Sequence, residues 1–394
     1  MNIENIKSQF PIFSRKINGK PLVYLDSSNS SQKPMCVINR LNDFYKNEFS
    51  NIGRSIHSLA INATNKFEET RISVKNFINA KFKEEIIFTK NATEAINLVA
   101  TTFGQQNIRK GDEIIITELE HHSNYVPWHF LRETRKAIIK FAPINEDGDI
   151  IIDKLQELIT SKTKIIAVTH LSNVTGTIVP IKEIVDIAHK KNIPVLVDGC
   201  QSVPHISVDV VDLDCDFYAF SGHKVYGPKG IGALYISKEI KHLVKPITFG
   251  GGQEQNIRSG SLNTSGIVRL RNFASENIWT AATPSSVYAV SGFLNDQDLA
   301  ISGHLASQSY WDGRLFPDSG LYFPSGNFAQ FGGPTSEGGA KTYPHQGQAR
   351  SVVMGRYAPT DTMGNSNIDS VIIGHRAAAL AVSNSGIVSI GESA

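Results

Sequence analysis

The chain has 394 residues, a formal net charge of +2 and three cysteines. This length suffices for a substantial core and predicts two or more domains. The small net charge argues against nucleic acid or an anionic membrane as the main partner. No apolar run can span a bilayer and the N-terminus has no signal-peptide pattern, so we expect a cytoplasmic protein without a membrane partner. Cys36, Cys200 and Cys215 match no zinc or redox spacing, and an odd count fits a reduced protein.

The composition changes along the chain. Of the 25 lysines, 24 lie at or before Lys245. After about residue 275 the chain becomes rich in Gly, Ser and Ala. We therefore predict two domains, 1–270 and 271–394.

The first domain has the alternating pattern of an α/β fold. Strands are expected at 85–89, 113–117, 137–141, 164–169, 193–198, 217–220 and 232–236. Helices are expected at 93–102, 126–134, 152–159 and 181–190. This alternation favours a mostly parallel sheet covered on both faces by helices. Ligands of such sheets bind at the carboxyl ends of the strands.

A lysine lies directly after one of these strands, in Ser221-Gly222-His223-Lys224. Burial favours a neutral lysine, which can form a Schiff base with the aldehyde of pyridoxal phosphate. Ser221 and His223 can hold the phosphate of that cofactor. Taken alone, such a motif is more often a surface lysine in a glycine-containing turn. The polar residues at the ends of other strands favour the cofactor site instead.

Polar residues also follow two earlier strands. Lys90–Ala95 opens a helix that Asn91 or Thr93 can cap, and the free N–H groups of its first turn suit a phosphate. Of the paired His121 and His122, one can stack on an aromatic cofactor and act as an acid or base. No third ligand is placed for a metal ion, so we expect no metal site.

Asp198 ends a strongly apolar strand. A buried carboxylate is unfavourable unless it meets a cation, and a protonated pyridine nitrogen is such a cation. This contact makes the ring an electron sink for charge from the substrate's α-carbon. Asn173, after another strand, can hydrogen-bond a ring oxygen or a substrate group.

Over roughly residues 1–270 the chain resembles the class V, fold-type I pyridoxal-phosphate enzymes, specifically group II cysteine desulfurases and selenocysteine lyases. The matching motifs include Gln32-Lys33-Pro34, Ile56-His57, Thr93–Val99, Glu120-His121-His122, Ser172–Gly176, Asp198–Ser202 and Ser221–Pro228. The resemblance implies an α/β fold-type I large domain with a mostly parallel sheet. It also implies conversion of L-cysteine or L-selenocysteine to L-alanine, with the sulfur passing to an acceptor protein for uses such as iron–sulfur cluster assembly.

The resemblance further implies roles for single residues. Lys224 forms the Schiff base with pyridoxal 5'-phosphate, Asp198 pairs with the ring nitrogen, and His121 stacks on the ring. The remaining contacts are those to the phosphate (Thr93, Ser221 and His223), to the ring oxygen or substrate (Gln201 and Asn173), and to the substrate alone (His57).

A glycine-rich loop, Gly250–Thr264, looks like the loop of related desulfurases that reaches the partner subunit's cofactor phosphate. Ser261 replaces the usual threonine and keeps its hydroxyl. This likeness implies a homodimer with shared active sites.

Two features depart from the family. No cysteine follows Cys215, although the second half of a desulfurase carries the nucleophilic cysteine that receives sulfur. Ser27–Ser30 stands where the family has Asn-Ala-Ala-Thr. Two alternatives therefore stay open: a cysteine or selenocysteine lyase without persulfide transfer, and an inactive cofactor-binding relic.

The second domain carries a short recurring pattern at 351–358, 370–377 and 387–394, whose glycines are 19 and 17 residues apart. It is similar to β-roll repeats of trimeric adhesin heads and some phage tail proteins, and predicts stacked short strands. A β-rich part with a structural or adhesive role and an irregular, partly disordered tail are both compatible with it. The break in composition fits a gene fusion, a frameshift or an assembly error.

Overall fold

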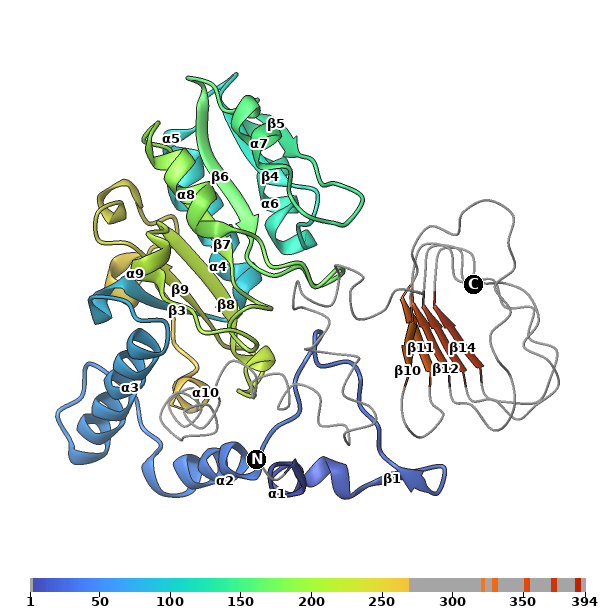
Figure 1. Cartoon of the computed structure of the whole chain (residues 1–394). Coiled ribbons are helices and arrows are strands. Elements are labelled where there is room, and N and C mark those ends of the chain that lie inside the picture. The colour runs from blue at the N-terminus through green and yellow to red at the C-terminus, as the bar shows by residue number, and fades with distance from the viewer. Residues whose placement is uncertain are drawn as a thin grey trace. The chain divides into compact units, whose positions relative to one another are not determined.

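The computed structural model describes residues 3–268 and five short strands between residues 320 and 390 (Figure 1). The chain divides into two units, Met1–Phe293 and Leu294–Ala394. Each unit is described by itself below.

A seven-stranded sheet forms the centre of the first unit (Figure 1). Its strands, in spatial order, are β3 (Ile86–Thr89), β9 (Gly232–Ile236), β8 (Phe217–Ser221), β7 (Val195–Asp198), β6 (Thr163–Thr169), β4 (Glu113–Thr117) and β5 (Ile138–Ala142). Only β9 runs antiparallel to its neighbours, so the expected mostly parallel sheet is confirmed.

The structure describes ten α-helices in this unit. They are α1 (Ile3–Lys7), α2 (Met35–Asp43), α3 (Ser58–Phe77), α4 (Ala92–Val99), α5 (Gln105–Asn107), α6 (Val126–Arg135), α7 (Ile152–Leu158), α8 (Ile181–His189), α9 (Val210–Leu213) and α10 (Thr264–Ile267). A small hairpin, β1 (Lys16–Ile17) and β2 (Lys20–Pro21), lies near the N-terminus.

The central strands are buried on both faces. Successive strand residues belong to two different hydrophobic clusters: Phe88 and Ile115 lie in one, Ile87 and Ile116 in the other. Because side chains alternate across a strand, the two clusters occupy opposite faces of the sheet. This two-sided burial explains why these strands are apolar throughout rather than alternating.

The expected elements agree with the structure to within a few residues. The strands expected at 113–117 and 232–236 have those bounds. The strand expected from residue 193 begins at Val195, since Pro194 has no N–H to donate to the sheet. The helix expected at 93–102 begins one residue earlier, at Ala92, and continues beyond Val99 as a π-helical segment, Ala100–Gly104.

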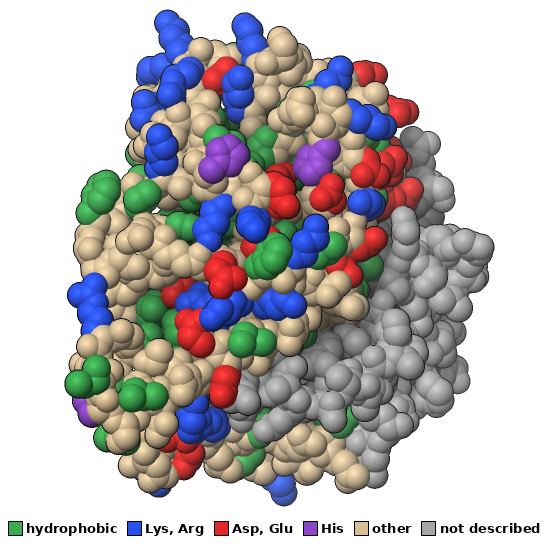
Figure 2. Space-filling view, turned by 90° about the vertical axis from the view of Figure 1, so that its left-hand side faces the viewer, with side chains coloured by type: hydrophobic (Ala, Val, Ile, Leu, Met, Phe, Trp, Pro, Cys, Tyr) green, Lys and Arg blue, Asp and Glu red, His purple; other side chains and the backbone are tan. Residues whose placement is uncertain are grey.

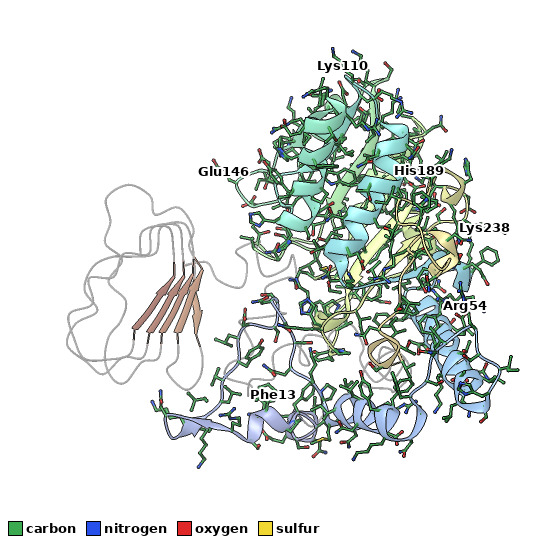
Figure 3. All side chains as sticks on the ribbon, turned by 180° about the vertical axis from the view of Figure 1, so that it is seen from behind. Phe13, Arg54, Lys110, Glu146, His189 and Lys238 are labelled. Atoms are coloured by element: carbon green, nitrogen blue, oxygen red, sulfur yellow. The ribbon has the colours of Figure 1, made fainter. Side chains whose placement is uncertain are left out.

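Charged side chains of both signs are scattered over the face of this unit that Figure 2 shows. Lys110, Glu146 and Lys238 lie at its periphery (Figure 3). Of the helices that the structure describes, none combines the length and apolar character needed to cross a bilayer.

The second unit contains a five-stranded sheet in the order β10 (Gly320–Tyr322), β11 (Phe328–Phe331), β12 (Ser351–Met354), β13 (Ser370–Ile373) and β14 (Ile387–Ile390). Strands β11 to β14 are parallel, and β10 is antiparallel to β11. Ser351 pairs with Ser370, which pairs with Ile387. Equivalent positions of the three repeats thus lie in register, as stacking predicts. The rest of each repeat lies outside the described residues.

Candidate active site

A cavity of about 220 Å³ lies at the carboxyl ends of the parallel strands. Its walls contain eight of the predicted site residues: Thr93, His121, Asn173, Asp198, Gln201, Ser221, His223 and Lys224. They come from the ends of β3, β4, β6, β7 and β8, or from the turns that follow. The sheet thus brings together residues up to 131 positions apart, between Thr93 and Lys224.

Lys224 lies at the end of a short 3-10 turn, Gly222–Lys224, that follows β8. Two amides of the next residues, Val225 and Gly227, donate to the carbonyl of Gly222 at 3.1 and 2.9 Å. The turn brings the Lys224 side chain to the cavity wall. An amine here can react with a carbonyl group bound in the cavity.

Asp198 is the last residue of β7 and is 3% exposed. One carboxylate oxygen accepts the amide of Cys200 at 3.0 Å. The next residue must be glycine, because a Cβ on Gly199 would lie 2.0 Å from the ring of Tyr218. This close packing fixes the direction in which β7 ends. A buried carboxylate on a cavity wall suits a cationic group of a ligand.

His121 follows β4 and forms part of the same cavity. Its Nδ1 accepts the Ser123 amide at 3.1 Å and lies 2.8 Å from the Ser123 hydroxyl. Burial, and next the charge of Lys224, lower the pKa of His121. The ring is therefore neutral at pH 7, and the Nδ1 contacts assign its proton to Nε2. His122, the other member of the pair, is not among the residues that line the cavity.

Another part of the cavity wall is formed by the start of α4. Asn91 caps this helix by accepting the amide of Glu94 at 2.8 Å, as one of the two expected caps. The Ser221 hydroxyl accepts the amide of Ala92 at 2.8 Å and so ties β8 to α4. Thr93 is exposed in the first turn. A helix N-terminus with hydroxyl groups beside it favours an anion such as phosphate.

Glu120, in the same motif as His121, is a partly buried acid that the sequence did not single out. It accepts hydrogen bonds from the Thr117 hydroxyl, the Asn124 amide and the backbone of Thr169 at 2.6, 2.6 and 2.8 Å. Burial raises the pKa of Glu120 to about 8, against the lowering effect of these bonds. It joins the ends of β4 and β6 beside the cavity.

Cys200 and Asn29 also line the cavity without having been predicted to do so. The Cys200 sulfur lies 3.9 Å from the Ser221 hydroxyl. Burial, and next Asp198, raise the pKa of the Cys200 thiol, and burial likewise raises that of Cys215. Both groups are therefore protonated thiols at neutral pH. Asn29 falls within Ser27–Ser30, the segment that departs from the family, so its place was not foreseeable from the motif.

Two predicted residues lie outside the cavity wall. His57 is exposed and caps α3, its Nδ1 accepting the Ala60 amide at 3.3 Å. Ser261 is exposed on the loop that follows β9. Arg54, three residues before His57, donates to the carbonyl of Gly251 on that loop at 2.5 Å. The segments carrying these two residues are thus joined to each other.

The residues present fit pyridoxal phosphate. A buried carboxylate for the ring nitrogen, an amine for the aldehyde and a helix N-terminus for the phosphate all border one cavity. Its volume is below the roughly 300–1,000 Å³ typical of drug-sized ligands and suits a single substituted ring. Among the residues from 3 to 268, no group of three or more His, Cys, Asp or Glu side chains is placed to hold a metal ion.

Comparisons with known proteins agree with this geometry. The sequence profile of the family described as Aminotransferase class-V matches residues 23–275. A probable cysteine desulfurase of Halalkalibacterium halodurans is 49% identical over 251 residues, which are 64% of this chain and 62% of that protein. A cysteine desulfurase of Cronobacter sakazakii is 43% identical over 284 residues, covering 68% of this chain and 70% of that protein. The chain thus spans less than two thirds of the Halalkalibacterium relative's length.

A solved structure shows the same fold. The cysteine desulfurase CsdA of Escherichia coli, in its S-sulfonic acid form, superposes with a TM-score of 0.63 at 33% sequence identity, covering 72% of each chain. Enzymes of this family depend on pyridoxal phosphate, which is therefore the cofactor of this chain. The matched region, the sheet and the cavity at its strand ends lead to one conclusion: the chain belongs to the class-V aminotransferase family of pyridoxal-phosphate enzymes.

Proposed function

We propose that the protein is a cysteine desulfurase that converts L-cysteine to L-alanine and passes the sulfur to a thiol. The observation that carries this proposal is the single cavity bordered by Lys224, Asp198 and His121. The desulfurase relatives at 43–49% identity support the choice of substrate.

Each cavity residue has a role in holding the cofactor and the substrate. Asp198 would pair with the ring nitrogen, and Thr93, Ser221 and His223 with the phosphate. When bound, pyridoxal phosphate supplies an electron sink that stabilises negative charge on the substrate's α-carbon. Gln201 is held in place because its amide donates to the carbonyl of Ser28 at 2.7 Å, which leaves its side-chain oxygen for other contacts.

Two residues handle protons. Lys224 Nζ would move the proton at the substrate's α-carbon, since it is the amine on the cavity wall. His121 would present its Nε2–H to the ligand, because Nδ1 is occupied by Ser123. The lowered pKa of His121 favours the uncharged ring at pH 7.

The fate of sulfur follows from the state of the thiols. In L-cysteine + RSH → L-alanine + RSSH, the carbon–sulfur bond of the substrate breaks and the acceptor sulfur gains a sulfur–sulfur bond. The acceptor must be a thiolate to attack sulfur. Because Cys200 and Cys215 are buried thiols with raised pKa values, we assign the acceptor role to a thiol other than these two.

Alanine formation from L-cysteine tests this proposal. The purified chain, loaded with pyridoxal phosphate and given an excess of a small thiol, should produce alanine, and Lys224→Ala should produce none. A variant outside the cavity, Lys238→Ala, should match the parent protein. Equal alanine from parent and Lys224→Ala would refute the assignment.

A second candidate, a lyase that releases sulfide, is favoured by the same protonated thiols. Its balance is L-cysteine + 2 RSH → L-alanine + H₂S + RSSR, so the thiol is the reductant. Free sulfide in proportion to alanine would favour the lyase. A stable protein persulfide on Cys200 or Cys215 would exclude it.

We further propose a homodimer in which the loop carrying Ser261 reaches the partner's cofactor phosphate. Two large apolar side chains support an interface here, since Ile56 and Phe249 are 94% and 83% exposed. Ile56→Asp should then give monomers in sedimentation velocity, whereas an unchanged dimer would argue against this surface.

We also propose that residues 1–270 form the enzyme domain and 271–394 a separate domain with a structural role. The in-register parallel strands of the three repeats support a repeat architecture. A stable protease-resistant fragment beginning near residue 271 would support this boundary. Rapid proteolysis throughout 271–394 would oppose it.

A further inference from the structure

The turn that carries Lys224 is hydrogen-bonded to a segment that lies almost 200 residues earlier in the chain. We propose that Lys33 and Ser31 are positioning residues that hold this turn, and with it Lys224, in place. The inference deepens the proposed function, since it rests on the role assigned to Lys224.

Most of these hydrogen bonds are made to one carbonyl group. The carbonyl oxygen of His223 accepts hydrogen bonds from Lys33 Nζ at 2.9 Å, the Ser31 amide at 3.1 Å and the Ser31 hydroxyl at 3.0 Å. This carbonyl belongs to the peptide unit that joins His223 to Lys224. The Ser30 hydroxyl donates to the same oxygen at 3.5 Å. These four donors therefore fix the backbone from which the Lys224 side chain starts.

Lys33 is partly buried, and its ammonium group meets oxygen atoms only. Besides the His223 carbonyl, its Nζ contacts the Ser31 carbonyl at 2.5 Å and the Ser31 hydroxyl at 3.5 Å. Burial, and next the charge of Lys229, lower the pKa of Lys33 to about 8. At pH 7 the group is still mostly charged, and charge-assisted hydrogen bonds of this kind are stronger than neutral ones.

The backbone just after Lys224 is strained. Tyr226 has a φ of +62°, in the left-handed region that residues other than glycine seldom adopt. Its amide donates to the Ser31 hydroxyl at 2.8 Å. Strained backbone of this kind persists only where its surroundings determine it. Ser31 thus supports the turn on both sides of Lys224.

The gripping segment is itself anchored to the fold. Gln201, three residues after the end of β7, donates to the carbonyl of Ser28 at 2.7 Å. The Tyr24 hydroxyl donates to the carbonyl of Ser30 at 2.6 Å. The segment that holds the Lys224 turn is therefore itself held in place by residues close to the carboxyl end of β7.

Amide hydrogen exchange in the cofactor-free chain tests whether Lys33 and Ser31 hold the turn, and it requires no enzymatic activity. In Lys33→Met and Ser31→Ala, exchange at Tyr226 and Gly227 should accelerate about tenfold or more, which corresponds to about 1.4 kcal/mol of local opening free energy. The peptide of β6 should be unchanged. Lys229→Met is the matched control, because it removes a nearby positive charge that makes no contact with the His223 carbonyl, and it should leave the turn protected.

Two results would overturn the proposal: unchanged exchange at Tyr226 and Gly227 in both variants, or equal acceleration in the turn and in β6. The second would mean that these residues support the whole fold. Ser31→Ala removes only one hydroxyl, so it keeps the test decisive if Lys33→Met fails to fold.

Covalent capture of the cofactor by Lys224 provides a second test. After incubation with pyridoxal phosphate and borohydride, the modified fraction of Lys224 should fall in Lys33→Met and remain at the parent level in Lys229→Met. If the parent chain captures no cofactor but amide exchange in the turn still accelerates in the variants, the proposed function is wrong. The role of Lys33 and Ser31 in holding the turn is then still supported. If the parent captures cofactor and both variants match it in amide exchange and in cofactor capture, Lys33 and Ser31 do not hold the turn. The proposed function is then unaffected.

Discussion

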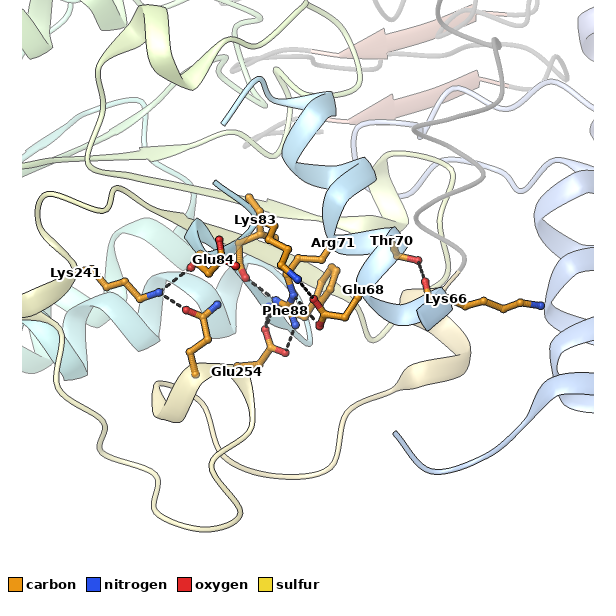
Figure 4. A network of polar contacts seen from close by, with 11 residues as sticks. Lys66, Glu68, Thr70, Arg71, Lys83, Glu84, Phe88, Lys241 and Glu254 are labelled. Atoms are coloured by element: carbon orange, nitrogen blue, oxygen red, sulfur yellow. Dashed lines mark hydrogen bonds and ion pairs between the residues drawn. The ribbon is translucent and has the colours of Figure 1, made fainter. Parts of the chain in front are cut away.

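Breaking the buried ion pair between Arg71 and Glu254 should destabilise the enzyme domain strongly. Arg71, on α3, donates to both oxygens of Glu254 at 2.8 Å, and the two side chains are 6% and 1% exposed (Figure 4). Arg71 also donates to the carbonyl of Ile86, and Glu254 accepts the amide of Phe88, both at 2.6 Å. The pair therefore fastens α3 and the glycine-rich loop to β3.

The magnitude follows from burial. Burial lowers the pKa of Arg71, but Glu254 and Glu68 together raise it overall, so the guanidinium is charged. Removing one partner of such a pair leaves an unpaired buried charge and costs about 3–5 kcal/mol. For the 266 residues from 3 to 268, an unfolding entropy of about 2.1 cal/mol/K per residue converts this into a fall in Tm of about 5–9 °C.

Thermal melts of Arg71→Met, Glu254→Gln and the double variant measure this effect. The double variant should lose less than the sum of the single losses, because the second substitution removes a charge that has already lost this partner. The matched control is Lys154→Met, which breaks an exposed pair with Glu157, 56% and 63% exposed, and should leave Tm unchanged. A fall below about 2 °C in both single variants, or strictly additive losses, would refute the reasoning.

Three further predictions concern other residues of the enzyme domain. His189, labelled in Figure 3, is hydrogen-bonded to Asp216, and this bond raises the pKa of His189. The contact therefore stabilises the fold below the ordinary histidine pKa of about 6.5, and this stabilisation is lost as pH rises through the higher folded value. His189→Gln should lower Tm more at pH 5.5 than at pH 9, and an equal loss at both would contradict this. Gly199→Ala should reduce soluble, cofactor-loaded protein, because its Cβ would overlap the ring of Tyr218, and normal loading would show that β7 can shift. The Cys200 thiol should resist iodoacetamide at pH 8 in the native chain and react only after denaturation, whereas rapid native alkylation would contradict its raised pKa.

The sequence was sufficient for the sheet and for most of the cavity. Apolar runs marked the strands because both faces of the sheet are buried, and polar residues at strand ends marked the site because parallel strands bring their carboxyl ends together. The strand at 113–117 and the cavity residues Asp198 and Lys224 were found in this way.

The long-range polar contacts could not be predicted. Lys33 meets the carbonyl of His223 across 190 positions, and Arg71 meets Glu254 across 183. Neither contact leaves a periodic or spacing signal, since the partners meet only once the sheet is assembled. Asn29 reaches the cavity for the same reason, carried there by the segment that the Lys224 turn binds.

The most direct test of the account is the site of cofactor attachment. The purified full chain should be incubated with pyridoxal phosphate, reduced with borohydride, digested and examined by mass spectrometry. We expect one pyridoxyl-modified lysine, Lys224, and no modification at this peptide in Asp198→Ala at limiting cofactor. Modification spread over surface lysines, or absent from Lys224, would contradict the central claim that this cavity is a pyridoxal-phosphate site.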